Sequence, residues 1–220
     1  VYKRQGYQIF FLGYHQLNEQ DLYMPNLIDA WSMNPISPQH TLHSLPNLYL
    51  MAQFSIRPLI LTRNIHDAVV SLTDHLETES AHTPLLNVPS DFMERPRNAR
   101  LDLVIDLAAP WYIRFTADWL HAGRDCLWLS YEELIKDSVT AVNDILDFYG
   151  LGAAMSTIEQ ALDGAKGRGS RFNQGIQGRG DCELDDEQKA RIDRLAHHDL
   201  RDSYRPSGIR QDAAQSCDDG

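Results

Sequence analysis

An arginine stands where a predicted strand passes into a predicted helix. The segment RPLILTRNIHDAVVSL begins with a short apolar run, and from Asn64 onward the apolar residues recur at helical spacing. The carboxyl ends of parallel strands face the ligand crevice, and the free N–H groups of a helix N-terminus favour an anion. The guanidinium of Arg63 could therefore hold a phosphate. The hydroxyl of Ser71, two turns into the helix, could donate a further hydrogen bond.

Two interpretations of this segment stay open from the residues alone. Asn64, followed by Asp67 on the first turn, resembles a capping box, which would begin the helix directly after the strand. In the first interpretation Arg63 and Ser71 bind an anion. In the second, Arg63 forms an ion pair with Asp67 while Ser71 faces solvent. An isolated pattern of this kind does not decide between them.

Two other segments carry residue types suited to phosphate binding or proton transfer. The segment GAKGRGSRFNQGIQGRGD places Arg171 among glycines, where a bidentate guanidinium and exposed backbone N–H groups could meet a phosphate. A solvated linker is the alternative interpretation of that segment. The segment PQHTLHSLP contains His40 and His43, whose ordinary pKa near neutrality suits a general base. A surface histidine beside prolines is the plainer interpretation of each.

The totals limit the class of protein. With 220 residues and a formal net charge of −11, we expect one domain and no broad nucleic-acid surface, so any anion site must be local. The cysteines are scattered and indicate neither a disulfide framework nor a metal knuckle; they are Cys126, Cys182 and Cys217. No apolar run approaches the roughly 20 residues of a membrane span.

The elements that must position these residues alternate between strand and helix. We expect buried strands at 58–62 and in CLWLSYEEL. We expect helices at 101–123, with an interruption or kink near Pro110, and in SVTAVNDILDFYGL and LDDEQKARIDRLAHHDL. This alternation indicates an α/β sheet covered on both faces.

Three further local predictions complete the chain. LPNLYLMAQF is predicted to be a helix with Asn47 as its N-cap. DLYMPNLIDAW is predicted to be a short helix with Leu27, Ile28 and Trp31 on one side. Residues 77–98 contain three prolines and little periodicity, so we expect a long, partly mobile loop.

The order of these segments resembles that of bacterial-type sulfotransferases, which use 3′-phosphoadenosine 5′-phosphosulfate (PAPS). RPLILTRNIHDAVVSL is similar to the family's 3′-phosphate-binding segment. CLWLSYEELIKDSVTAVNDILDFYGL looks like its next strand, Tyr-Glu-Asp/Glu-Leu turn and helix, and RFNQGIQGRGD resembles its C-terminal nucleotide loop. The resemblance covers about residues 36–197.

The resemblance implies a P-loop-type α/β fold, a three-layer sandwich with a central parallel sheet flanked by helices. It implies transfer of a sulfuryl group from PAPS to a hydroxyl or amine, with no metal. It further implies that Arg63 and Ser71 bind the 3′-phosphate, that Tyr131 lies near the adenine, and that Arg171 and Gly175 close over the phosphate.

The resemblance also concerns the acceptor side. It implies a histidine general base, for which His40 is the first choice and His43 the alternative. The acceptor would be a small molecule, a glycan or a lipid, and the protein cytoplasmic. Aromatic residues of APWYIRFTADW could line the acceptor site, although their helical spacing favours a core stripe; they are Trp111, Tyr112, Phe115 and Trp119.

The sequence departs from the family pattern in three places. Residues 1–35 contain no Lys-Ser-Gly-Thr-Thr-like phosphosulfate turn, so we expect the first strand and this turn to be missing and the chain as written to be inactive. Gln174 stands where the family often has lysine, and GRGD lacks the tryptophan that often follows it.

The ends of the chain have their own interpretation. Residues 1–5 match the translation of a transposon end used in sequencing libraries, so we expect a sequencing or cloning scar. Residues 6–202 would then form one partial domain and residues 203–220 a flexible tail.

Two alternative functions remain. One is a non-catalytic nucleotide-binding or interaction module that uses the same arginine. The other is a different P-loop transferase, such as a small-molecule kinase. That enzyme would need a Walker-type lysine and acidic magnesium ligands, and neither is visible at the corresponding place in the sequence.

Overall fold

The computed structural model describes residues 9–13, 20–31, 33, 35–78, 82–83, 86–120, 126–165 and 177–200. Within these ranges, short strands are separated by longer helices. In chain order the elements are α2 (Met24–Ala30), α3 (Leu45–Gln53), β1 (Leu59–Thr62), α4 (Ile65–Thr78), β2 (His82–Thr83), β3 (Leu86–Asn87), the 3-10 helix η2 (Phe92–Glu94), α5 (Arg97–Leu120), β4 (Leu127–Ser130), α6 (Tyr131–Lys136), α7 (Ser138–Phe148), α8 (Met155–Ala165), α9 (Arg179–Glu183) and α10 (Asp186–Leu200).

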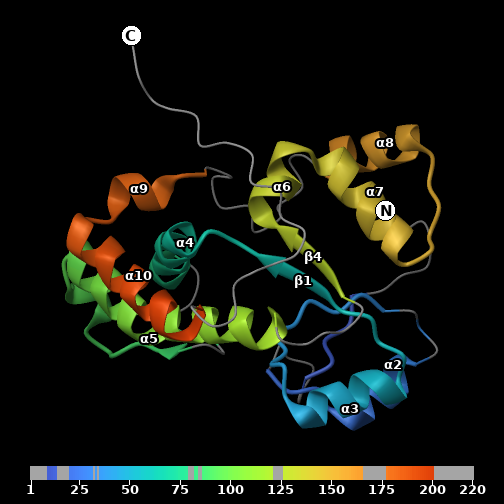
Figure 1. The fold of residues 1–220 in the computed structure, drawn as a ribbon, viewed down its shortest axis with the longest axis horizontal. Helices are drawn as coiled ribbons and strands as arrows, with labels where there is room; N and C mark the ends of the chain where they lie inside the picture. The colour runs from blue at the N-terminus through green and yellow to red at the C-terminus, as the bar shows by residue number, and fades with distance from the viewer. Residues whose placement is uncertain are drawn as a thin grey trace.

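Strands β1 and β4 pair in parallel, and their shared register positions everything that follows them. Leu59 lies opposite Leu127 and Thr62 opposite Ser130, so both strands end at the same edge. Each strand then runs almost directly into a helix, α4 after β1 and α6 after β4 (Figure 1). The predicted α/β class with a parallel sheet is confirmed, and both strands lie where the sequence predicted them.

Two apolar clusters share the long helix α5. The first cluster joins α4, α5 and α10 through fully buried residues, among them Val69, Leu101, Val104, Ile105 and Ile192. The second cluster joins β1 to the N-terminal helices and to the end of α5 through Leu27, Met51, Ile60 and Trp119. Figure 1 shows α4, α5, α9 and α10 gathered at one end of the molecule, with α2 and α3 below the sheet at the other.

Helix α5 is longer at its start than the sequence predicted. It begins at Arg97 and runs through Pro110 as one helix to Leu120, whereas a helical region with an interruption or kink was expected at 101–123. A proline inside a helix removes one backbone hydrogen bond. The buried side chains on both sides of Pro110, from Ala109 to Ile113, supply packing that offsets this loss. Gly123, the predicted end, lies outside the described residues.

The predicted N-cap of α3 is wrong. Ser44 caps the helix, because its side chain accepts a hydrogen bond from the backbone N–H of Asn47. Asn47 itself is buried within the first turn. Its amide nitrogen donates to the carbonyl of Leu42 at 2.9 Å, and its amide oxygen accepts from the N–H of Leu22 at 2.9 Å. Asn47 therefore links the segment around Leu22 to the segment that precedes α3, rather than starting the helix.

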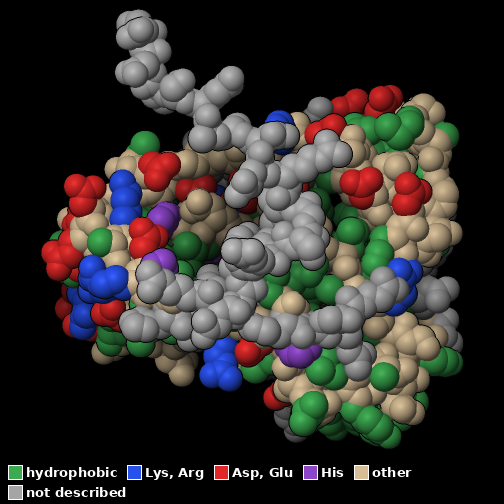
Figure 2. Space-filling model, viewed as in Figure 1, with side chains coloured by type: hydrophobic (Ala, Val, Ile, Leu, Met, Phe, Trp, Pro, Cys, Tyr) green, Lys and Arg blue, Asp and Glu red, His purple; other side chains and the backbone are tan. Residues whose placement is uncertain are grey.

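The short helix predicted in DLYMPNLIDAW is present as α2, and the three apolar residues placed on one side of it differ in burial. Leu27 is buried, but Ile28 and Trp31 are 59% and 61% exposed. The buried residues of the helix are Asn26, Leu27 and Ala30. On the face shown in Figure 2, apolar side chains lie exposed over α2 and α3, while acidic and basic side chains intermingle at the end formed by α5, α9 and α10.

The predicted loop at 77–98 contains more structure than its prolines indicated. Strands β2 and β3 form an antiparallel pair, with His82 opposite Asn87. Leu86 and Phe92 are buried in the first apolar cluster, so this connection is part of the core. The helix α8 was not predicted; only its last two residues, Gly164 and Ala165, fall in the glycine-rich segment that was expected to be a loop. None of the described helices is long and apolar enough to cross a membrane.

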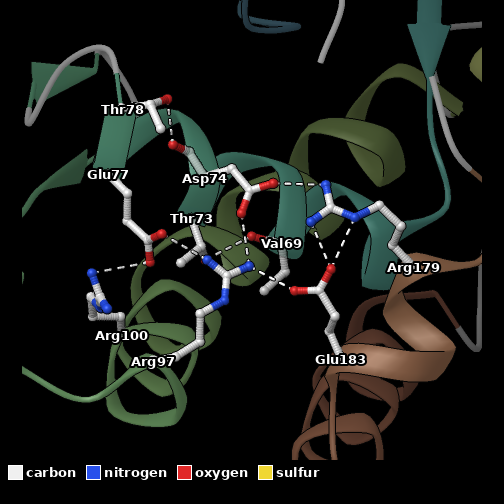
Figure 3. A network of polar contacts seen from close by, with 9 residues as sticks. All are labelled: Val69, Thr73, Asp74, Glu77, Thr78, Arg97, Arg100, Arg179 and Glu183. Atoms are coloured by element: carbon white, nitrogen blue, oxygen red, sulfur yellow. Dashed lines mark hydrogen bonds and ion pairs between the residues drawn. The ribbon is translucent and has the colours of Figure 1, made fainter. Parts of the chain in front are cut away.

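A network of ion pairs joins α4, α5 and α9 (Figure 3). The guanidinium of Arg97 bonds Asp74 and Glu183 at 2.7 Å each and Glu77 at 2.8 Å. Arg179 bonds Asp74 at 2.7 Å and Glu183 at 2.6 Å. Burial by itself would lower the pKa of Arg97, but the bonds to Glu183 and Asp74 outweigh it and raise that pKa above its ordinary value. Arg97 therefore stays charged and holds three carboxylates together.

Replacing Arg97 should destabilise the fold more than replacing an exposed arginine of the same helix. Arg97→Ala would leave three neighbouring carboxylates without their common partner, at a cost of about 1–3 kcal/mol. Arg114 is 75% exposed in its side chain and pairs with Asp118 one turn away, so Arg114→Ala should change stability by less than about 0.5 kcal/mol. Urea unfolding measures both values. Equal losses in the two variants would contradict this account of the network.

Candidate functional site

The candidate site begins where β1 and β4 end. Arg63 follows the last residue of β1, and Tyr131 follows the last residue of β4. Because Thr62 and Ser130 are paired in the parallel register, the two following residues emerge side by side. The guanidinium carbon of Arg63 lies 4.5 Å from the centroid of the Tyr131 ring. This cation–π contact joins two residues that the sequence analysis selected for separate reasons.

Helix α4 starts directly after Arg63, as the sequence predicted. The side-chain oxygen of Asn64 accepts hydrogen bonds from the N–H groups of His66 at 2.9 Å and Asp67 at 3.3 Å. The reciprocal half of the predicted capping box is wrong. The N–H of Asn64 donates to Oε1 of Glu132 at 3.0 Å. The carboxylate that accepts this N–H therefore comes from the start of α6 and not, as predicted, from Asp67.

Asp67 instead binds the segment that leads into α9. Its side chain is buried, and its two oxygens accept hydrogen bonds from Gly178 N–H at 2.8 Å and Gly180 N–H at 2.7 Å. The fit at Gly180 is close, because a Cβ added there would lie 2.4 Å from the Cβ of His66. A residue with a side chain cannot occupy this position without moving α9 away from α4.

The same segment also reaches α6. The side-chain amide of Gln177 donates to the backbone carbonyl of Glu132 at 3.2 Å. Residues 177–180 thus contact both helices that begin at the sheet edge, next to Arg63 and Tyr131. The neighbouring predicted residues Arg171 and Gly175 lie outside the described residues.

A capping box fixes the start of α6 and with it Tyr131. The hydroxyl of Ser130 accepts from Glu133 N–H at 3.1 Å, and Ser130 N–H donates to Glu133 Oε2 at 2.9 Å. The bonds from the backbone and side chain of Ser130 lower the pKa of Glu133. The pattern Ser-x-x-Glu in SYEE was a signal for this helix start that the sequence analysis did not use.

The remaining candidate for phosphate binding, Ser71, lies on α4 one turn after Asp67 and is half-buried. Residues at this spacing share one face of a helix. Ser71 therefore lies on the face of α4 to which the Gly178–Gly180 segment is bound, rather than on a fully solvated face.

The two candidate bases lie in the loop before α3 and pack against α5. The His40 ring centroid is 5.9 Å from that of Trp111, and the His43 centroid is 5.1 Å from that of Trp119. The indole N–H of Trp119 donates to the carbonyl of Thr41 at 3.0 Å, which fixes the loop between the two histidines. Trp119 is 1% exposed, as expected of a core residue.

A set of contacts along α5 connects the histidines with the arginine. Trp111 stacks on Phe115 at 5.0 Å and meets Tyr112 edge-on at 5.5 Å. Burial raises the pKa of Tyr112 to about 12, and the positive charge of Arg63 acts in the opposite direction. Arg63 therefore lies close enough to act on the phenol. His40 thus packs on Trp111, and the charge of Arg63 acts on the next residue of the helix, Tyr112.

Comparison with known proteins shows which fold surrounds this site. The chain has the fold of the mouse sulfotransferase SULT7A1, whose crystal structure contains PAP (3′-phosphoadenosine 5′-phosphate). The TM-score is 0.65 at 16% identity, and the match covers 90% of this chain and 76% of the mouse chain. No protein-family model and no curated protein matches the sequence. The sulfotransferase fold implied by the sequence resemblance is confirmed.

The buried phenol of Tyr112 should make stability fall at alkaline pH. The folded chain retains the Tyr112 proton up to about pH 12, whereas an unfolded tyrosine releases it near pH 10. Stability should therefore be complete below pH 10 and decline between these values, by on the order of 2–3 kcal/mol in total. Tyr112→Phe cannot ionise and should lack this part of the decline. Parallel stability–pH curves for the two proteins in urea unfolding would contradict the prediction.

Proposed function

We propose that this chain binds PAPS at the edge where β1 and β4 end, as part of a sulfotransferase that transfers the sulfuryl group to a hydroxyl or amine. The observation that carries the proposal is the guanidinium of Arg63 held over Tyr131 at the paired strand ends. It is supported by the fold, which is that of a sulfotransferase crystallised with PAP.

The nucleotide would be recognised chiefly through its 3′-phosphate and its adenine. The planar guanidinium of Arg63 can donate two parallel hydrogen bonds to a phosphate, and the Ser71 hydroxyl can add a third. The Tyr131 ring offers an aromatic edge and face to the adenine. Arg171 and Gly175 complete the proposed set at positions outside the described residues.

Transfer would proceed by in-line displacement at sulfur. The acceptor oxygen attacks the sulfur atom and forms the new O–S bond, while the S–O bond to the 5′-phosphate breaks and PAP leaves. His40 accepts the proton of the acceptor hydroxyl. His40 is favoured over His43 because it packs on Trp111, next to Tyr112 and the charge of Arg63, whereas Nε2 of His43 is buried from solvent.

A second candidate function is binding of the nucleotide without transfer. It would need Arg63 and Tyr131 at the strand ends but no Lys-Ser-Gly-Thr-Thr-like turn to stabilise charge on the transferring group. The gene sequence directly upstream of Gly6 discriminates the two. A turn of this type encoded in frame supports transfer, and a native start codon at that point supports binding alone.

Removing the arginine should weaken binding of PAP to the chain. Arg63→Ala should raise the Kd for PAP about 10- to 100-fold, the effect of losing a charge-assisted pair of hydrogen bonds. Arg114→Ala removes the same charge from an exposed position of α5 and serves as the matched control. Isothermal titration calorimetry at fixed salt measures both. An unchanged Kd in Arg63→Ala would refute the phosphate assignment.

The base can be tested in a chain extended by the phosphosulfate turn. His40→Ala should lower kcat for sulfuryl transfer about 10²–10⁴-fold while leaving the Kd for PAP unchanged, because a general base acts only in the chemical step. The measurement is transfer of labelled sulfate from PAPS to a phenol. If His43→Ala shows this loss and His40→Ala does not, the assignment of the base is wrong.

A further inference from the structure

The first turns of α4 carry a buried carboxylate between the two groups proposed to bind phosphate. Asp67 lies in the first turn of α4, four residues after Arg63 in the sequence and one helical turn before Ser71. Only 3% of the surface of Asp67 is exposed to solvent. A negative charge at this place opposes the binding of an anion to its neighbours, and burying it is costly unless its oxygens are hydrogen-bonded.

The carboxylate is not needed to start the helix. Asn64 caps α4, and Glu132 accepts the N–H of Asn64. Both oxygens of Asp67 are used instead to accept N–H bonds from Gly178 and Gly180. These bonds place two backbone dipoles against the charge.

The helix α9 is also anchored without Asp67. Figure 3 shows Arg179 bonded to Asp74 of α4 and to Glu183 of α9, and Arg97 of α5 bonded to the same two carboxylates. The bonds of Asp67 therefore do not attach α9 as a whole. They fix the backbone that enters it, where Gly180 lies directly against His66.

We propose that Asp67 is a positioning residue that couples binding of the 3′-phosphate to docking of residues 177–180 on α4. When the segment is docked, the charge of Asp67 is taken up by two N–H groups. When the segment is undocked, that charge faces the phosphate on Arg63 and Ser71. A 3′-phosphate therefore binds the docked state more tightly and, by reciprocity, stabilises it.

The inference rests on the proposed function and makes a separate prediction. PAP should slow hydrogen exchange at Gly178 and Gly180 about 5- to 150-fold, the usual range of coupling between two binding events. 5′-AMP at equal occupancy lacks the 3′-phosphate and should slow it less. The amide of Gly164 in α8 is the internal reference for global stabilisation. Exchange is measured by NMR on the ¹⁵N-glycine-labelled chain.

Two variants separate the coupling from a general effect on structure. In Asp67→Asn, PAP should still bind but should no longer slow exchange at Gly178 and Gly180 beyond the effect of 5′-AMP. Asp193→Asn removes an exposed carboxylate that pairs with His66 and should leave the PAP effect intact. If Asp67→Asn does not fold, the comparison of PAP with 5′-AMP in the unaltered chain decides the question.

The outcomes distinguish the two proposals. If PAP binds in an Arg63-dependent manner but protects the two glycines no more than 5′-AMP does, the coupling is refuted while the proposed nucleotide site stands. The same conclusion follows if the PAP effect persists in Asp67→Asn. If PAP does not bind at all, both proposals are refuted.

Discussion

The parallel pairing of β1 with β4 determines where each described part of the candidate site lies. Because Thr62 lies opposite Ser130, the residues that follow the two strands emerge together, and Arg63 meets Tyr131. The same register brings the start of α6 to the start of α4, where Glu132 accepts the Asn64 N–H. A shift of one residue in this pairing would turn the two side chains to opposite faces of the sheet.

Three of the described arginines of this acidic chain have contrasting surroundings. Arg97 and Arg179 form ion pairs with carboxylates, and these pairs hold α4, α5 and α9 together. Arg63 lies against an aromatic ring and near a neutral phenol. An aromatic neighbour holds a guanidinium in place through a cation–π contact rather than through a carboxylate.

The sequence predicted the strands, the start of α4 and the residues at the strand ends because each has a local signal. Apolar runs, helical spacing and Asn64 all lie within a few positions of one another. The role of Asp67 could not be predicted, because its partners Gly178 and Gly180 lie over a hundred residues away and offer only backbone N–H groups. Asn47 was misassigned for a related reason, since Ser44 gives an equally good local signal and the deciding contacts are tertiary. The burial of Phe92 was not predicted either, because this residue lies in a proline-rich stretch and is buried only by packing with α4 and α5.

Helix α5 has a mechanical consequence for the site. It is one continuous helix from Arg97 to Leu120, with one end among the carboxylates of α4 and α9 and the other in the apolar cluster that contains Trp119. A helix resists stretching along its axis far more than loops resist bending. A molecule that displaced Trp111 would therefore disturb two ring contacts at once, to Tyr112 and to His40 in the loop that the Thr41–Trp119 bond holds. Substitutions at either end of α5 are therefore expected to change the positions of Trp111 and Tyr112, which lie near its middle.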